Sequence, residues 1–189
     1  SYGWLSPAHP DPHGCTAKAV LRFLSGDVGS HFDGLFWDWA SLPQIDPDAH
    51  GCDLCKANWA NDEGCCERHA RSAAHDQRFR KGLSGMANLY ASPLGCSVVQ
   101  SREVPTPPEG CTYTLTRFEQ RGWCIFEQHA AMIVVGTDNG FRQPRGVPKK
   151  LLDVTGVDAP PIAAAPPPEE FRRLLKRARF TGRGDQERV

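Results

Sequence analysis

The sequence lacks an excess of charge of either sign, because its 189 residues include 22 lysines and arginines and 22 aspartates and glutamates. It also lacks any apolar run near the roughly 20 residues that a bilayer-spanning helix needs. Its N-terminus has no basic segment followed by an apolar one, as a secretory signal would have. These absences give no electrostatic reason to expect a nucleic-acid or membrane partner. We therefore expect a cytoplasmic protein that uses neither.

The sequence also lacks the cysteine spacing of a disulfide-rich domain and the motif of serine hydrolases. The eight cysteines do not form the framework of a small disulfide-rich domain, because four of them crowd into one loop and the others stand singly in predicted elements. We therefore expect reduced thiols. No GxSxG motif occurs, and Cys124 is expected to face the core, so the sequence does not indicate a serine or cysteine hydrolase.

The crowded loop, GCDLCKANWANDEGCCERH, contains a CxxC pair followed by two adjacent cysteines and a histidine. Thiolates and imidazole are the ligands that zinc prefers in closed tetrahedral sites. Adjacent cysteines chelate one ion poorly, so the third cysteine ligand is either Cys65 or Cys66. Taking Cys65, we predict a structural zinc site made of Cys52, Cys55, Cys65 and His69. The alternative is a polar insertion with unliganded thiols.

Apolar residues recur at helical spacing in some segments and form short unbroken runs in others. The first pattern predicts helices at 16–25, 76–91, about 113–135 and around 171–178, and the second predicts strands at 34–39, 96–101 and 149–155. Strands that alternate with helices form parallel sheets covered on both faces. We therefore expect an α/β fold with a flavodoxin-like parallel sheet and helices on both faces.

The domain organisation follows from composition. We expect one α/β domain over residues 1–157, with a Cys/His-rich insertion at about 46–75. Residues 158–189 read as a proline-rich linker and a C-terminal helix. The five Lys and Arg residues of EEFRRLLKRARF accompany an apolar stripe, which is typical of a solvated charged face rather than a nucleic-acid contact.

Ligands bind parallel sheets at the carboxyl ends of the strands, so the loops that follow the strands are the candidate site. These loops are GWLSPAHPDPHG (3–14) and ASLPQIDPDAHG (40–51). The prolines of HPDPHG indicate a rigid loop, and its position after the first strand would let His9 or Asp11 line a pocket.

With this architecture, the segment RGWCIFEQHAAMIV (121–134) resembles the third-helix motif of Toll/interleukin-1 receptor (TIR) domains, in which a Trp-Cys pair is followed by a Glu four residues after the Trp. Trp123, Cys124 and Glu127 match that spacing. SYGW and GLFWDW are similar to the end of the first TIR strand and to the second strand. FWDWASLPQ and GLSGMANLYAS also resemble heterokaryon-incompatibility domains, which are TIR relatives. The loop after the second strand is longer than in that family, and most of the first strand is missing.

The resemblance implies cleavage of NAD, or a related nucleotide, at the bond between nicotinamide and ribose in stress or immune signalling. A carboxylate beside the ribose would stabilise the oxocarbenium-like transition state, so Glu127 is the predicted catalytic residue and NAD the predicted substrate. The residues expected to line the nucleotide pocket are Ser1, Tyr2, Trp4, His9, Asp38, Trp39 and Trp123. Alternatively, Glu127 is an ordinary solvated helix glutamate, and the chain is a non-catalytic TIR-like signalling module. In both cases we expect self-association, and other TIR-like domains are expected partners.

Overall fold

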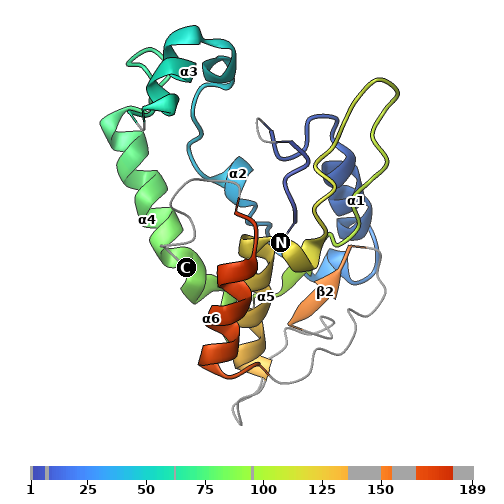
Figure 1. Cartoon of the computed structure of the whole chain (residues 1–189). Coiled ribbons are helices and arrows are strands. Elements are labelled where there is room, and N and C mark those ends of the chain that lie inside the picture. The colour runs from blue at the N-terminus through green and yellow to red at the C-terminus, as the bar shows by residue number, and fades with distance from the viewer. Residues whose placement is uncertain are drawn as a thin grey trace. The chain divides into compact units, whose positions relative to one another are not determined.

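The computed structural model describes residues 2–6, 9–61, 63–94, 96–135, 150–154 and 165–180, apart from the side chains at positions 47, 50, 59 and 60 (Figure 1). The chain divides into two compact units. The larger unit comprises Ser1–Asp33 and Ala87–Val189, and the smaller unit is Gly34–Met86.

The helices and strands follow this division. The larger unit contains α1 (Cys15–Leu24), η1 (Gly29–His31), β1 (Val98–Gln100), η3 (Phe118–Gln120), α5 (Gly122–Val135), β2 (Leu151–Asp153) and α6 (Pro168–Arg177). The smaller unit contains α2 (Asp38–Ser41), η2 (Pro47–Gly51), α3 (Asp53–Ala60) and most of α4 (Ala73–Tyr90), whose last turn belongs to the larger unit. The helices predicted at 16–25, 76–91 and around 171–178 are confirmed as α1, α4 and α6.

Two short strands form the sheet of the larger unit. β1 and β2 pair in parallel, with Val98 opposite Leu151 and Gln100 opposite Asp153. Tyr2 adds one parallel bridge to Ser101, just after β1. The alternating pattern predicted this parallel pairing of strands separated by a helix. The described residues nevertheless form a mixed α/β structure that is mostly helical, with a small two-stranded sheet in place of a full flavodoxin-like one.

Apolar side chains pack on both strands. Phe23 of α1 and Leu152 of β2 form a buried cluster, which the partly buried Leu24, Val28, Phe32 and Val99 extend. Successive strand residues point to opposite faces, so the buried Val98 and Gln100 lie on the other side of β1 from Val99. Helix α5 contacts both strands. The sheet is small, but both α1 and α5 of the larger unit pack against it.

Helix α6 packs against α5 through aromatic rings. The ring of Phe171 stacks on His129 at a centroid distance of 5.0 Å, and Phe180 meets Trp123 edge-on at 6.4 Å. The backbone joins the two segments as well, because Gly122 N–H donates to the carbonyl of Arg179 at 2.9 Å. The two helices therefore run in opposite directions along one another.

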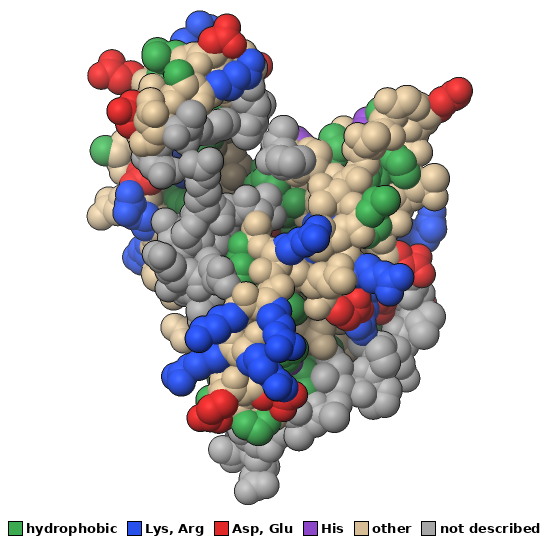
Figure 2. Space-filling view, in the orientation of Figure 1, with side chains coloured by type: hydrophobic (Ala, Val, Ile, Leu, Met, Phe, Trp, Pro, Cys, Tyr) green, Lys and Arg blue, Asp and Glu red, His purple; other side chains and the backbone are tan. Residues whose placement is uncertain are grey.

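The charged face of α6 is solvent-exposed, as its sequence predicts. Figure 2 shows a group of Lys and Arg side chains over this helix, whereas Leu175 on its other face is buried. Among the described residues, no helix combines the length and the apolar character that crossing a bilayer would require.

The strand predicted at 34–39 is wrong. Residues 34–37 have no regular structure, Asp38 begins the short helix α2, and the side chains of Leu35 and Phe36 are 48% and 41% exposed. Ser41 Oγ accepts the N–H of Trp37 at 3.0 Å, which a neighbouring strand would otherwise bind. A short apolar run does not by itself distinguish a strand from other structures, and Asp and Ser favour the end of a helix.

The helix predicted from about residue 113 begins later, as α5, at Gly122. The side chain of Arg121 explains the delay. Its guanidinium donates to the carbonyls of Thr114 at 3.0 Å and Thr116 at 2.8 Å, so these carbonyls are bonded by a side chain in an irregular segment rather than by helix N–H groups. It also donates to the carbonyl of Trp4, 2.5 Å away, and thereby ties the N-terminal segment to the start of α5.

Candidate functional site

Four ligand atoms converge in the smaller unit. Cys52 directly precedes α3, Cys55 lies in its first turn, and Cys66 and His69 lie in the turn before α4. The Sγ atoms of Cys55 and Cys66 are 3.4 Å apart. His69 Nδ1 is 3.5 Å from Cys55 Sγ and 3.3 Å from Cys66 Sγ. With Cys52 included, the ligand atoms all lie within 4.8 Å of one another.

Local backbone bonds hold these side chains together. Cys52 N–H donates to the carbonyl of Ala49 at 3.2 Å, which sets the entry into α3. His69 N–H donates to the carbonyl of Cys66 at 3.0 Å and closes the second turn. Cys66 N–H points at Cys55 Sγ, 3.4 Å away, so the two turns face each other.

The two cysteines of the CxxC pair differ in burial and in the pKa of their thiols. Cys55 is fully buried, and this burial raises the pKa of its thiol to about 12. The backbone N–H of Cys55 lowers the pKa of the Cys52 thiol, which is only partly buried. Cys52 is therefore the readier thiolate, and Cys55 would lose its proton when a metal ion binds.

The cluster fits a tetrahedral metal ion. Zinc–sulfur and zinc–nitrogen bonds place neighbouring ligand atoms about 3.5–3.8 Å apart in a tetrahedron. The three separations between Cys55, Cys66 and His69 run from 3.3 to 3.5 Å. The four side chains can thus hold a metal ion such as zinc. The predicted ligand Cys65 is corrected to Cys66, because the described residues bring only the second of the adjacent cysteines into the group.

The smaller unit has few other buried side chains. Its buried hydrophobic residues among those described are Ala49, Cys55 and Met86, and His69 is 4% exposed. Two of these four belong to the metal cluster. A small unit with so little apolar burial gains much of its stability from a cross-link such as a bound metal ion.

Glu127 lies inside the larger unit. Its side chain is 6% exposed and accepts a 2.9 Å hydrogen bond at Oε1 from the hydroxyl of Tyr90, in the last turn of α4. The hydroxyl donor stabilises negative charge on the carboxylate. The solvated-helix alternative for Glu127 is therefore wrong, because the carboxylate is buried and bonded.

The other expected pocket residues of the larger unit have structural contacts. Trp123, on the same helix as Glu127, packs against Phe126 and Phe180. Tyr2 forms the bridge to Ser101, the carbonyl of Trp4 accepts from Arg121, and His9 Nδ1 accepts the N–H of Asp11 at 2.9 Å. Asp38 and Trp39 belong to α2 of the smaller unit, and Ser1 lies outside the described residues.

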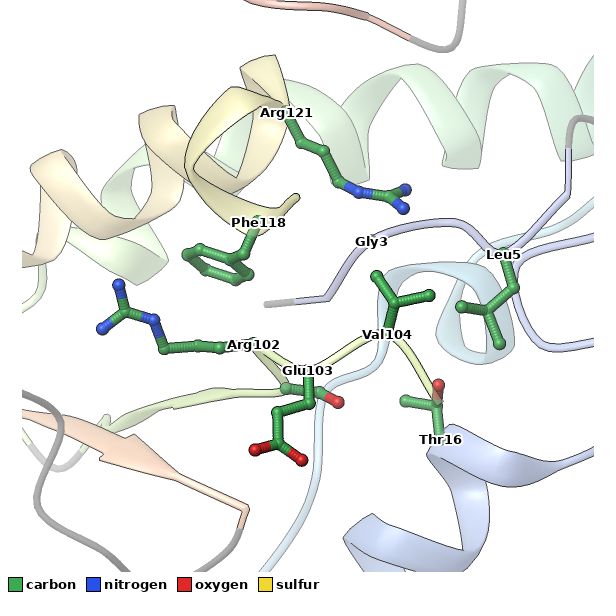
Figure 3. Close-up of a pocket in the computed structure, with 9 residues that line it drawn as sticks. Gly3, Leu5, Thr16, Arg102, Glu103, Val104, Phe118 and Arg121 are labelled. Atoms are coloured by element: carbon green, nitrogen blue, oxygen red, sulfur yellow. The ribbon is translucent and has the colours of Figure 1, made fainter. Parts of the chain in front are cut away.

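A small pocket occupies the carboxyl end of the parallel strands, where ligands are expected (Figure 3). Gly3 and Leu5 line it after the Tyr2 bridge, Arg102 and Val104 after β1, and Arg121 before α5. Its volume of about 10 Å³ holds roughly one water molecule. The pocket touches the expected loop 3–14 through Gly3 and Leu5, but it includes none of the expected pocket residues and as it stands has no room for a nicotinamide ring.

Sequence reasoning missed Tyr90 and the choice of Cys66. In the sequence, Tyr90 is one of the apolar-face residues of the helix predicted at 76–91, and no local signal links it to a glutamate 37 positions away. For the adjacent cysteines, the Cys-x-x-His spacing of Cys66 and His69 mirrors the CxxC pair and was a usable signal.

The comparisons with known proteins leave the TIR-like resemblance as a prediction. No protein-family model, no curated protein and no solved structure matches this chain.

Proposed function

We propose that the chain is a zinc-binding protein, in which one structural zinc ion organises residues 34–86. The observation that carries this proposal is the convergence of three thiols and one imidazole within 4.8 Å. All four ligand positions are taken by protein atoms, so the ion has no open position for a substrate. The zinc would instead cross-link the start of α3, together with Cys52 just before it, to the turn before α4.

The adjacent cysteines provide a matched test. We expect about one zinc per chain in protein purified without added metal, measured by elemental analysis. Cys66→Ser removes a ligand and should lower zinc content to near zero, whereas Cys65→Ser changes the neighbouring thiol and should leave it unchanged. Reduced wild-type protein without zinc, or equal losses in the two variants, would contradict the proposal.

A second candidate function is cleavage of NAD at Glu127, and the buried carboxylate with its Tyr90 donor supports it. Burial of a glutamate is costly unless the group has partners or a function. A fixed carboxylate would stabilise the positive charge that develops on ribose when nicotinamide leaves. Glu127 does not line the pocket beside Arg121, so this reading requires a rearrangement on nucleotide binding that both widens the pocket and opens it to the carboxylate. The TIR-like motif adds support from the sequence alone.

The NAD proposal is tested by nicotinamide release at high protein concentration, since TIR-like enzymes generally act as assemblies. Glu127→Gln keeps the shape but removes the charge, so turnover should fall about a hundredfold or more. Unchanged turnover in this variant would refute the catalytic role of Glu127. No nicotinamide release from wild-type assemblies would favour a non-catalytic module that acts through self-association or TIR-like partners.

A further inference from the structure

Four side chains of the larger unit form a chain of polar contacts that is separate from both the metal cluster and Glu127. Cys111 Sγ lies 3.5 Å from His13 Nε2, and His13 Nδ1 lies 2.7 Å from the hydroxyl oxygen of Tyr113. That oxygen is 3.6 Å from Cys15 Sγ. A thiol, an imidazole and a group that orients the imidazole are thus in contact in the order that an activated nucleophile requires.

The loop before α1 holds His13 in place. Asp11 Oδ2 accepts the N–H of Ala17 at 2.8 Å and ties the loop to the first turn of the helix. Pro12 restricts the backbone on one side of His13. Gly14, on the other side, has a φ of 68°, a left-handed conformation that glycine adopts without strain.

The segment that carries Cys111 and Tyr113 is also anchored. Gly110, at a φ of 75°, turns the chain just before Cys111. Thr114 N–H then donates to the carbonyl of Leu5 at 2.7 Å. Cys111 and Tyr113 are two positions apart in the sequence. Cys111 contacts Nε2 of His13 and Tyr113 contacts Nδ1, so this segment contacts both nitrogens of the imidazole.

The thiol and the imidazole of this cluster are accessible to solvent, whereas the phenol is buried. Tyr113 is 7% exposed, whereas His13 is exposed and Cys111 is half-buried. A reagent can therefore reach the sulfur while the orienting phenol stays shielded from water. Burial raises the pKa of Tyr113 to about 12, so the phenol remains neutral at physiological pH.

We propose that Cys111 is a nucleophilic thiol that His13 activates and that it is a site of covalent modification by soft electrophiles. The proton of Cys111 Sγ passes to His13 Nε2, and the sulfur electron pair forms a bond to the electrophilic carbon. The leaving group departs with its own electron pair. Tyr113 is a positioning residue, because its bond to Nδ1 keeps Nε2 directed at the thiol. Neither the zinc site nor NAD cleavage is needed for this reaction.

Iodoacetamide is a direct probe, since alkylation forms the carbon–sulfur bond, expels iodide and leaves the proton on His13. The rate for each cysteine is read by mass spectrometry on the full chain at pH 7. Cys96 is also half-buried and serves as the internal reference. We expect Cys111 to react about tenfold faster, because an imidazole in contact with the thiol takes its proton as the carbon–sulfur bond forms.

Variants assign the effect to the imidazole. His13→Gln should remove the excess rate at Cys111 and leave the Cys96 rate unchanged. His31→Gln alters another exposed histidine and should change neither rate. Tyr113→Phe keeps the ring and should lower the Cys111 rate several-fold without altering the far-UV circular dichroism. A Cys111 rate equal to that of Cys96, or an excess that survives His13→Gln, would overturn the proposal.

Discussion

The hydroxyl of Tyr90 donates a hydrogen bond to the buried carboxylate of Glu127 in the larger unit. A buried carboxylate that loses a hydrogen-bond donor keeps its desolvation cost without the compensating bond. The pair therefore matters for stability whether or not Glu127 is catalytic, and the two roles are separable by experiment.

Tyr90→Phe should lower the free energy of unfolding by about 1–3 kcal/mol, because it removes only the hydroxyl group. Urea-induced unfolding followed by circular dichroism measures the change. In a Glu127→Met background the same substitution should cost less than about 0.5 kcal/mol, since no carboxylate remains to be satisfied. Equal costs in the two backgrounds would show that the bond to Glu127 is not the source of the effect.

Tyr113 should titrate later than an ordinary tyrosine. Burial and the contact with Cys15 raise its pKa from 10.0 to about 12, so the folded state holds the phenol proton more tightly than the unfolded state. Its stabilising contribution is complete below pH 10 and is lost as the pH rises from 10 to about 12. The difference in absorbance at 295 nm between wild type and Tyr113→Phe isolates this step. A midpoint near 10 would contradict the assigned environment.

For single residues, the sequence predicted the kind of site better than it predicted which side chains contact one another. The CxxC spacing and His69 pointed to a metal cluster, because two ligands one turn apart at a helix start can reach one ion. The sequence did not settle between Cys65 and Cys66, since that depends on which way the turn directs each side chain. The burial of Glu127 depends on a helix distant in sequence.

Helix α5 begins where the ring of Phe180 covers Gly122. A Cβ atom built on Gly122 would lie 2.2 Å from the ring of Phe180, far inside van der Waals contact. Glycine at the start of this helix thus allows the segment after α6 to pair with the backbone of residues 120–122.

Gly122→Ala should therefore destabilise the protein by about 1–3 kcal/mol, although alanine is normally the better helix residue. Thermal or urea unfolding gives the value. In a Phe180→Ala background the ring is absent, and Gly122→Ala should be neutral or stabilising. The same loss in both backgrounds would mean that something other than Phe180 excludes a side chain at this position.

Among the elements, amphipathic helices were predicted well and the aromatic run was not. The stripes of α1 and α6 are set by local sequence and by one packing surface. GLFWDW was taken as a strand because it is short and apolar, but a strand also needs a partner that only the fold supplies. The start of α5 depends on Arg121, whose side chain captures carbonyls earlier in the chain.

For the molecule as a whole, the alternating pattern correctly indicated parallel pairing around a connecting helix. It overestimated the sheet, because one predicted strand became irregular chain followed by α2. The Cys/His-rich insertion expected at about 46–75 lies within the smaller unit, Gly34–Met86. Composition located this segment, but it did not predict α3.

Removal of zinc should unfold the smaller unit selectively. With a strong chelator under reducing conditions, we expect backbone hydrogen exchange to rise across α3 and the turn at 66–70, because few apolar side chains remain to hold them. Exchange in β1 and α5 should change little. Mass spectrometry of peptic fragments measures both regions. Unchanged protection of α3 after complete metal removal would refute a structural role for the ion.

The close fit of Phe180 over Gly122 also constrains how the chain can diverge in evolution. A side chain at position 122 is best tolerated when position 180 is small, and an aromatic ring at 180 favours glycine at 122. Homologous sequences should therefore change at these two positions together, although 58 positions separate them. Such covariation would mark the chains in which the C-terminal segment docks on α5 as it does here.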